Sequence, residues 1–187
     1  MWSSKDIALV ILIAITALVY SLFVGQMAMV ITGIQGINYI LFIGHTIWAT
    51  VAFLLFEGRR WRFALTGTLV VILTYPTFLM GPPFDLVPRV PAILNAVFAD
   101  IIMNSIYLAF KKREKIFIWS ILSVFTFSTG DLLFRTLILP IFYPPEFVSP
   151  ILGLFLLLSP LVIFEALVGG FIGYQIFQRI RNIRKPN

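Results

Sequence analysis

The chain has 187 residues, of which 60% are hydrophobic and only 12% are charged, and its mean hydropathy is +1.00. A soluble domain carries about a quarter charged residues, so this chain has too little polar surface to cover a soluble globule. It is expected to be a membrane protein with about six or seven helical spans at most. These spans would use nearly the whole length, which leaves no room for a soluble catalytic domain. The net charge of +6 is therefore interpreted as a sign of membrane topology and not of nucleic-acid binding.

Six apolar stretches follow one another along a single domain, residues 1–187. The first is preceded by Ser3 and Asp6, whose spacing predicts a helix cap. Residues 26–36 are predicted to form a connecting loop or a short, partly inserted segment. The last apolar stretch contains Pro160 and is predicted to be either kinked there or split into two helices. The expected spans are residues 7–24, 38–56, 63–80, 91–110, 116–139 and 158–178.

The basic residues support this count of spans. With six crossings, twelve of the 14 Lys and Arg residues fall on one side of the membrane, and Arg89 and Arg135 are the exceptions. The positive-inside rule places both termini and the basic connections in the cytoplasm. The predicted fold is therefore an all-α integral protein of the cell membrane with six transmembrane helices.

The residue types also exclude several kinds of chemistry. The chain has no cysteine and one histidine, so thiolate sites and sites built from two histidines are absent. No P-loop or dinucleotide-binding glycine motif occurs. We expect no cofactor and no metal ion, and any ATP that drives transport would be bound by a partner.

Each charged group inside a span raises the free energy of membrane insertion by about 3 kcal/mol. Such a group is therefore expected to have an oppositely charged partner or a functional role. Asp131 and Arg135 are four residues apart and share a helical face. They are either a self-neutralising pair or part of a site. Counted along the helices, the ionisable groups fall in the outer half of the membrane, which predicts a pocket open to the outside. The expected substrate contacts are His45, Arg89, Asn95, Asp100, Asp131, Arg135 and Glu165, with Trp48 and Tyr39 stacking on the substrate.

A site with both acids and bases suits a zwitterionic or heterocyclic ligand. The alternatives are a small membrane enzyme that acts on a lipid, and a structural subunit in which the charges only pair helices. Small residues at Ala17, Ser21 and Gly25 recur every four positions on the first helix. Such a ladder lets helices approach closely, either within the protein or at a partner.

Two local motifs carry a resemblance that extends over the whole chain: KDIALV at 5–10, which leads into the small-residue first helix, and PLVIFEALVGGFIGY at 160–174. With six spans and this size, the chain resembles the substrate-binding S components of energy-coupling factor (ECF) transporters. The resemblance implies uptake of a vitamin or cofactor precursor, together with a transmembrane coupling protein and two ABC ATPases. It also implies that the first-helix ladder contacts the coupling protein, although the family's ladder usually begins with alanines. The His-containing extension of the metal-binding branch is not found, which favours an organic ligand.

Overall fold

The computed structural model describes residues 2–33 and 42–183, and every regular element among them is helical. The helical fold class predicted from the composition is confirmed for these residues. The elements are α1 (Ser4–Tyr20), the π-helix η1 (Ser21–Gln26), α2 (Met27–Thr32), α3 (Ile43–Phe56), α4 (Arg62–Thr74), the 3-10 helix η3 (Val87–Arg89), α5 (Val90–Lys112), α6 (Ile116–Phe142) and α7 (Pro145–Ile183).

Four helical segments are long and apolar enough to cross a membrane: Ser4–Gln26, Val87–Lys112, Ile116–Phe142 and Pro145–Asn182. Helices α3 and α4 have 14 and 13 residues, which makes them about 21 and 20 Å long. The hydrocarbon core of a bilayer is about 30 Å thick. Four crossings are therefore supported by length and composition, and the total of six remains a prediction.

The first helical segment is longer than the sequence indicated. Instead of a loop from residue 26, the chain continues through η1 and α2 as far as Thr32. Gly25 weakens a helix by about 1 kcal/mol but does not end it, and residues 26–32 contain neither glycine nor proline. The helix ends before Gly33, whose φ of +68° suits a glycine.

Helix α4 ends earlier than expected, at Thr74 instead of residue 80. Pro76 has no N–H to donate to the carbonyl of Ile72, and its ring would crowd that carbonyl. The N–H of Tyr75 donates to Ile72 instead, at 3.2 Å. This tighter turn closes the helix and starts the irregular connection to α5.

The last apolar stretch forms one continuous helix, α7, of 39 residues. Pro160 lies inside it and leaves the carbonyl of Leu156 without its usual N–H donor. The hydroxyl of Ser159 donates to that carbonyl at 2.8 Å, which satisfies the group and lets the helix continue. The predicted split at Pro160 is therefore wrong for this helix.

Small residues on α7 bring it close to its neighbours. A Cβ atom added at Gly169 would overlap Thr46 of α3, and one added at Gly173 would overlap Thr50. Aromatic rings fill the core beside this contact, where Phe53 of α3 stacks on Phe63 of α4 with centroids 3.9 Å apart. Helix α3 is thus held between α7 on one side and the aromatic core on the other.

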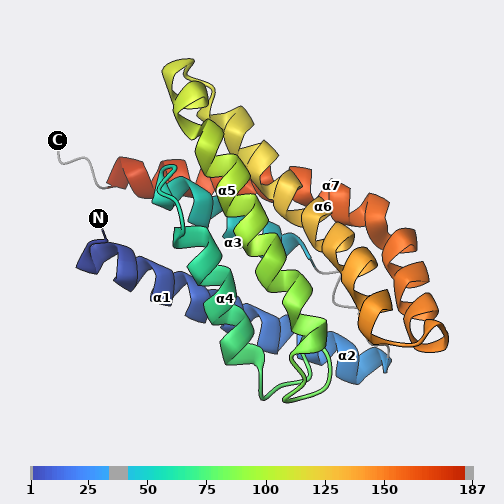
Figure 1. Ribbon diagram of the computed structural model, residues 1–187. Coiled ribbons are helices and arrows are strands. Elements are labelled where there is room, and N and C mark those ends of the chain that lie inside the picture. Colours follow the sequence, from blue (N-terminus) through green and yellow to red (C-terminus); the bar gives the residue numbers. More distant parts are fainter. Residues whose placement is uncertain (1, 34–41, 184–187) are drawn as a thin grey trace.

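The connections between helices are sorted to two ends of the molecule. Helix α1 begins, and α7 ends, on the side that carries the α3–α4 and α5–α6 connections (Figure 1). We call this the basic end. The α4–α5 and α6–α7 connections lie at the opposite end. The described basic residues of the basic end are Lys5, Arg59, Arg60, Arg62, Lys111, Lys112, Arg113, Lys115, Arg179 and Arg181.

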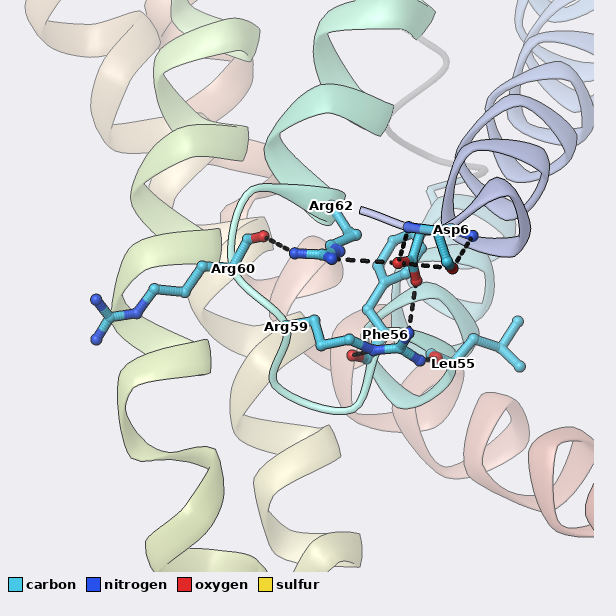
Figure 2. A network of polar contacts seen from close by, with 7 residues as sticks. Asp6, Leu55, Phe56, Arg59, Arg60 and Arg62 are labelled. Atoms are coloured by element: carbon cyan, nitrogen blue, oxygen red, sulfur yellow. Dashed lines mark hydrogen bonds and ion pairs between the residues drawn. The ribbon is translucent and has the colours of Figure 1, made fainter. Parts of the chain in front are cut away.

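Asp6 fastens the start of α1 to the α3–α4 connection at the basic end (Figure 2). Its carboxylate accepts from Arg59 Nη1 at 2.5 Å and from Arg62 Nη2 at 3.2 Å. The backbone N–H of Ser3 donates to the same carboxylate, and the N–H of Asp6 donates to Ser3 Oγ. The predicted cap of the first helix is confirmed, and its acidic residue also joins two elements distant in sequence.

Candidate functional site

A cavity of about 230 Å³ lies towards the end opposite the basic end, where it meets the α4–α5 and α6–α7 connections. An apolar cavity of roughly 150 Å³ holds benzene, so this one has room for a ring with several substituents. Its polar lining residues are Ser21, Gln26, His45, Asn95, Asp131, Arg135 and Tyr143, and its other aromatic lining residues are Phe42, Trp48, Phe78, Phe127, Phe147 and Phe155.

Helix α6 contributes an ion pair to the cavity wall. Arg135 Nε donates to Asp131 Oδ2 at 2.9 Å, and the two side chains are 13% and 8% exposed. The shared helical face predicted from their spacing is confirmed. The guanidinium carbon of Arg135 also lies 5.8 Å from the ring centroid of Phe155 on α7. Because each charge faces its opposite, the wall is polar but carries no net charge here.

His45 of α3 also lines the cavity, next to α1. Its Nε2 is 2.9 Å from Ser21 Oγ, and Ser21 Oγ donates to the carbonyl of Ala17 at 2.8 Å. The ring of Phe42 stacks on the imidazole, with centroids 5.3 Å apart and planes inclined by 15°, and Tyr20 packs against it edge-on. The imidazole is therefore fixed by one hydrogen bond and two rings, and no described residue forms a hydrogen bond with its buried Nδ1.

The small-residue ladder of the first helix faces inward. Ala17, Ser21 and Gly25 are buried, and all three line the cavity. These three residues therefore lie on the inner face of the first helical segment. The predicted contact with a coupling protein would have to involve another face of α1.

Trp48 and Asn95 also reach the cavity and tie its walls together. The indole N–H of Trp48 donates to the carbonyl of Ile13 on α1 at 2.6 Å. Asn95 of α5 donates from Nδ2 to the carbonyl of Phe127 on α6 at 2.8 Å. Both residues line the cavity, and each donates a hydrogen bond to a neighbouring helix.

Asp100 does not line the cavity, contrary to the prediction. Its carboxylate accepts from the backbone N–H groups of Trp61, Phe63 and Ala64 at 2.7, 2.8 and 3.0 Å. The first N–H groups of a helix lack partners within the helix, and no side chain of α4 itself caps them. Asp100 supplies this cap from α5, and that role explains its place inside the protein.

Glu165 has a comparable role at the start of α3. Its carboxyl group lies beside the backbone N–H groups of Phe42 and Ile43, its Oε2 is buried without a hydrogen bond from the described residues, and its backbone carbonyl accepts from Thr46 Oγ1 at 3.0 Å. The side chain is only 6% exposed and does not line the cavity. The predicted substrate contact is therefore replaced by a structural one between α7 and α3.

Arg89 is fully buried and organises the α4–α5 connection instead of facing the cavity. Its guanidinium donates to the carbonyls of Thr74, Thr77 and Pro82 at 3.2, 2.7 and 2.8 Å, and also to that of Asp85. These groups include the end of α4, where carbonyls lack partners within the helix. Tyr39, the remaining predicted contact, lies outside the described residues.

Tyr143 is a cavity residue that the sequence did not reveal. It follows α6, and its hydroxyl donates to Asp85 Oδ2 at 2.6 Å, which links the α6–α7 connection to the α4–α5 connection. Burial, followed by the neighbouring Asp85 carboxylate, raises the pKa of Tyr143 to about 12. Tyr143 lines the cavity at the end opposite the basic end, and its hydrogen bond to Asp85 holds it there.

Phe127 and Leu139 were also missed, although the sequence contains their signal. They lie four residues before Asp131 and four after Arg135, on the same face of α6, and both line the cavity. The helical face that Asp131 and Arg135 share, extended by one turn in each direction, contains both residues.

Among the described residues, no group of three His, Asp or Glu side chains could hold a metal ion. The chain matches no model of a protein family, no curated protein and no solved structure. Fold and cavity together define an all-helical protein with several helices able to cross a membrane and an internal cavity lined by aromatic rings and one ion pair.

Proposed function

We propose that this protein binds a small polar organic molecule, such as a vitamin or cofactor precursor, for uptake into the cell. The observation that carries the proposal is the cavity of about 230 Å³, which combines several aromatic rings with the Asp131–Arg135 pair and His45. Sites for small molecules are typically apolar and aromatic, with a few placed polar groups. The chain is not proposed to be an enzyme.

The position of the cavity supports uptake from outside. It lies away from the end that carries most of the basic residues. The positive-inside rule assigns that basic end to the cytoplasm. In the proposed arrangement, six helices cross the cell membrane, both termini are cytoplasmic, and the cavity faces the side from which a nutrient arrives.

We further propose that the protein is the substrate-binding S component of an ECF-type importer. The sequence contains no ATP-binding motif, so the energy for import would come from a coupling protein and two ABC ATPases. Because Ala17, Ser21 and Gly25 point inward, the surface offered to the coupling protein is the opposite face of α1. Exposed apolar side chains cover that face, including Ile11, Leu12, Ile15 and Val19.

Purification from native membranes in mild detergent tests both parts of the proposal. Mass spectrometry of the purified sample should find a small organic molecule released on denaturation, and a membrane protein with two ATPases bound to the tagged chain. A bound molecule without these partners would support binding but contradict the ECF assignment. Turnover of a lipid by the isolated protein would instead favour an enzyme.

A further inference from the structure

The connection between α5 and α6, residues 111–115, concentrates positive charge at the tip at the top of Figure 1. Four of its five residues are basic, the fifth is Glu114, and all five are exposed. No described residue forms an ion pair or a hydrogen bond with the side chain of Arg113 or of Lys115. Because like charges repel each other, the connection suits an anion that the described part of the chain does not supply.

Hydrogen bonds fix the backbone that carries these two basic side chains. The N–H of Lys115 donates to the carbonyl of Phe110 at 2.9 Å. The N–H of Glu114, whose φ is +58°, donates to the carbonyl of Lys111 at 3.1 Å. Together these bonds form a Schellman motif, which closes the end of α5. Arg113 and Lys115 therefore project from a defined turn.

A small surface pocket is formed by the end of α5 and the first turn of α6. Its lining residues include Phe110, Arg113, Lys115 and Ile118, so basic and apolar side chains share the same pocket. Along α6, Ile118 is followed by Leu122 and Phe125 on the same helical face, and all three are exposed. The pocket therefore continues into an apolar stripe that runs along the helix.

This combination matches a phospholipid better than it matches a soluble anion. The phosphate of a lipid can pair with a guanidinium and an ammonium group, while an acyl chain packs on the apolar stripe. A soluble anion would gain nothing from Phe110 and Ile118. The positive-inside rule assigns this end of the molecule to the cytoplasm, and basic clusters directly beside a membrane helix attract anionic lipids there.

We propose that the pocket binds the head group of an anionic phospholipid of the cytoplasmic leaflet. Arg113 and Lys115 hold the phosphate, and an acyl chain follows Ile118 and Leu122 into the membrane. The pocket and the internal cavity have no lining residue in common. The inference therefore goes beyond the proposed function and does not depend on what the cavity binds. A lipid at this position holds the tip of the α5–α6 hairpin at the membrane surface.

Two paired substitutions separate a defined site from general attraction to the connection. Arg113→Gln with Lys115→Gln removes the basic residues of the pocket. Lys111→Gln with Lys112→Gln removes the same charge from the same connection, at positions that do not line the pocket. Purified protein in mild detergent is titrated with phosphatidylglycerol or with phosphatidylcholine, and bound lipid is counted by native mass spectrometry.

Wild-type protein should bind phosphatidylglycerol more tightly than phosphatidylcholine. The dissociation constant for phosphatidylglycerol should rise about thirtyfold in the pocket variant, the size expected for two basic residues, and far less in the matched control. Equal losses in the two paired variants would show diffuse attraction and overturn the proposal. An unchanged constant in the pocket variant, or no preference for phosphatidylglycerol in the wild type, would overturn it as well.

Two further measurements complete the test. Glycerol 3-phosphate has the phosphate but no acyl chain, so an excess should leave phosphatidylglycerol bound; displacement would overturn the lipid assignment in favour of a soluble anion. All four substituted side chains are exposed, so both paired variants should unfold at the wild-type temperature in the same detergent. The ligand of the cavity is measured separately, and failure of the lipid site leaves the proposed function intact.

Discussion

Asp100 on α5 accepts a hydrogen bond from the backbone N–H of Phe63 at 2.8 Å and thereby caps a helix that has no cap of its own. Glu165 on α7 places its carboxyl group beside the start of α3. The two shortest of the principal helices thus each begin beside a carboxyl group of a long neighbour. Asp6 and Asp100 thus serve helix ends, whereas the buried Asp131 of α6 lines the cavity and pairs with Arg135.

The first prediction concerns this cap. Asp100→Ala leaves three backbone N–H groups without their acceptor and should lower the free energy of unfolding by about 1–3 kcal/mol. Asp100→Asn keeps one amide oxygen and should lose less. Thermal unfolding in detergent measures both. Ligand binding by the folded fraction should be unchanged, because Asp100 does not line the cavity. A loss of binding in that fraction would show that Asp100 contacts the ligand.

The second prediction separates the two roles of the Asp131–Arg135 pair. Removing one partner, as in Asp131→Leu or Arg135→Met, leaves a buried charge and should cost about 3–5 kcal/mol of stability. The double variant removes both charges and should recover most of this loss. If the pair also contacts the ligand, the double variant stays folded but binds weakly. A stable double variant with full binding would assign the pair to helix insertion alone.

The third prediction follows from the pKa of Tyr143. Because burial and Asp85 raise it to about 12, from an ordinary value of 10.0, the neutral phenol is favoured in the folded protein. The resulting contribution to stability is complete below pH 10 and is lost as the pH rises towards about 12. The phenolate absorbance that Tyr143→Phe removes should therefore appear near pH 12. In Asp85→Asn the pKa should fall only part of the way, since burial is the larger cause; a midpoint near 10 in the parent would contradict this.

The fourth prediction concerns topology. The chain has no cysteine, so single cysteines can be labelled without background. Gly58 is a poor position, because its φ is +74° and a Cβ atom would overlap the ring of Tyr107. Arg60 and Glu146 are exposed and lie at opposite ends of the molecule. A membrane-impermeant thiol reagent outside the cell should label Glu146→Cys and leave Arg60→Cys unlabelled; labelling of both from outside would refute the assigned topology.

Much of the helical organisation follows from local sequence. The cap of α1 at Ser3 and Asp6 and the shared face of Asp131 and Arg135 depend on spacings of three and four residues, so the sequence predicts them. The close approach of α7 at Gly169 depends in the same way on a local pattern, since Gly169 and Gly173 are four residues apart. The predicted end of α4 was too late in the chain, because Pro76 stops the helix although apolar residues follow it.

Only part of the candidate site was predicted correctly, and the errors have a physical cause. A buried carboxylate can accept hydrogen bonds from a ligand or from the N–H groups of a helix end. The sequence indicates only that the carboxylate is buried. Asp100 and Glu165 were assigned to the pocket because depth along one helix does not reveal where a neighbouring helix begins. Arg89 was also wrongly assigned to the pocket. Its acceptors are carbonyls of the irregular α4–α5 connection, whose conformation the sequence pattern does not reveal. His45, Trp48, Asn95 and the α6 pair do line the cavity.

The central claim is that the cavity holds a small molecule, and the most direct test is to fill it. Ala92 lines the cavity from α5, whereas Ala109 lies exposed on the same helix. Ala92→Phe and Ala109→Phe add the same volume at the two positions. The amount of small molecule released per chain on denaturation is then measured by mass spectrometry. We predict that wild-type protein and Ala109→Phe release the same molecule in equal amounts and that Ala92→Phe releases almost none. Equal release from both variants would contradict the account.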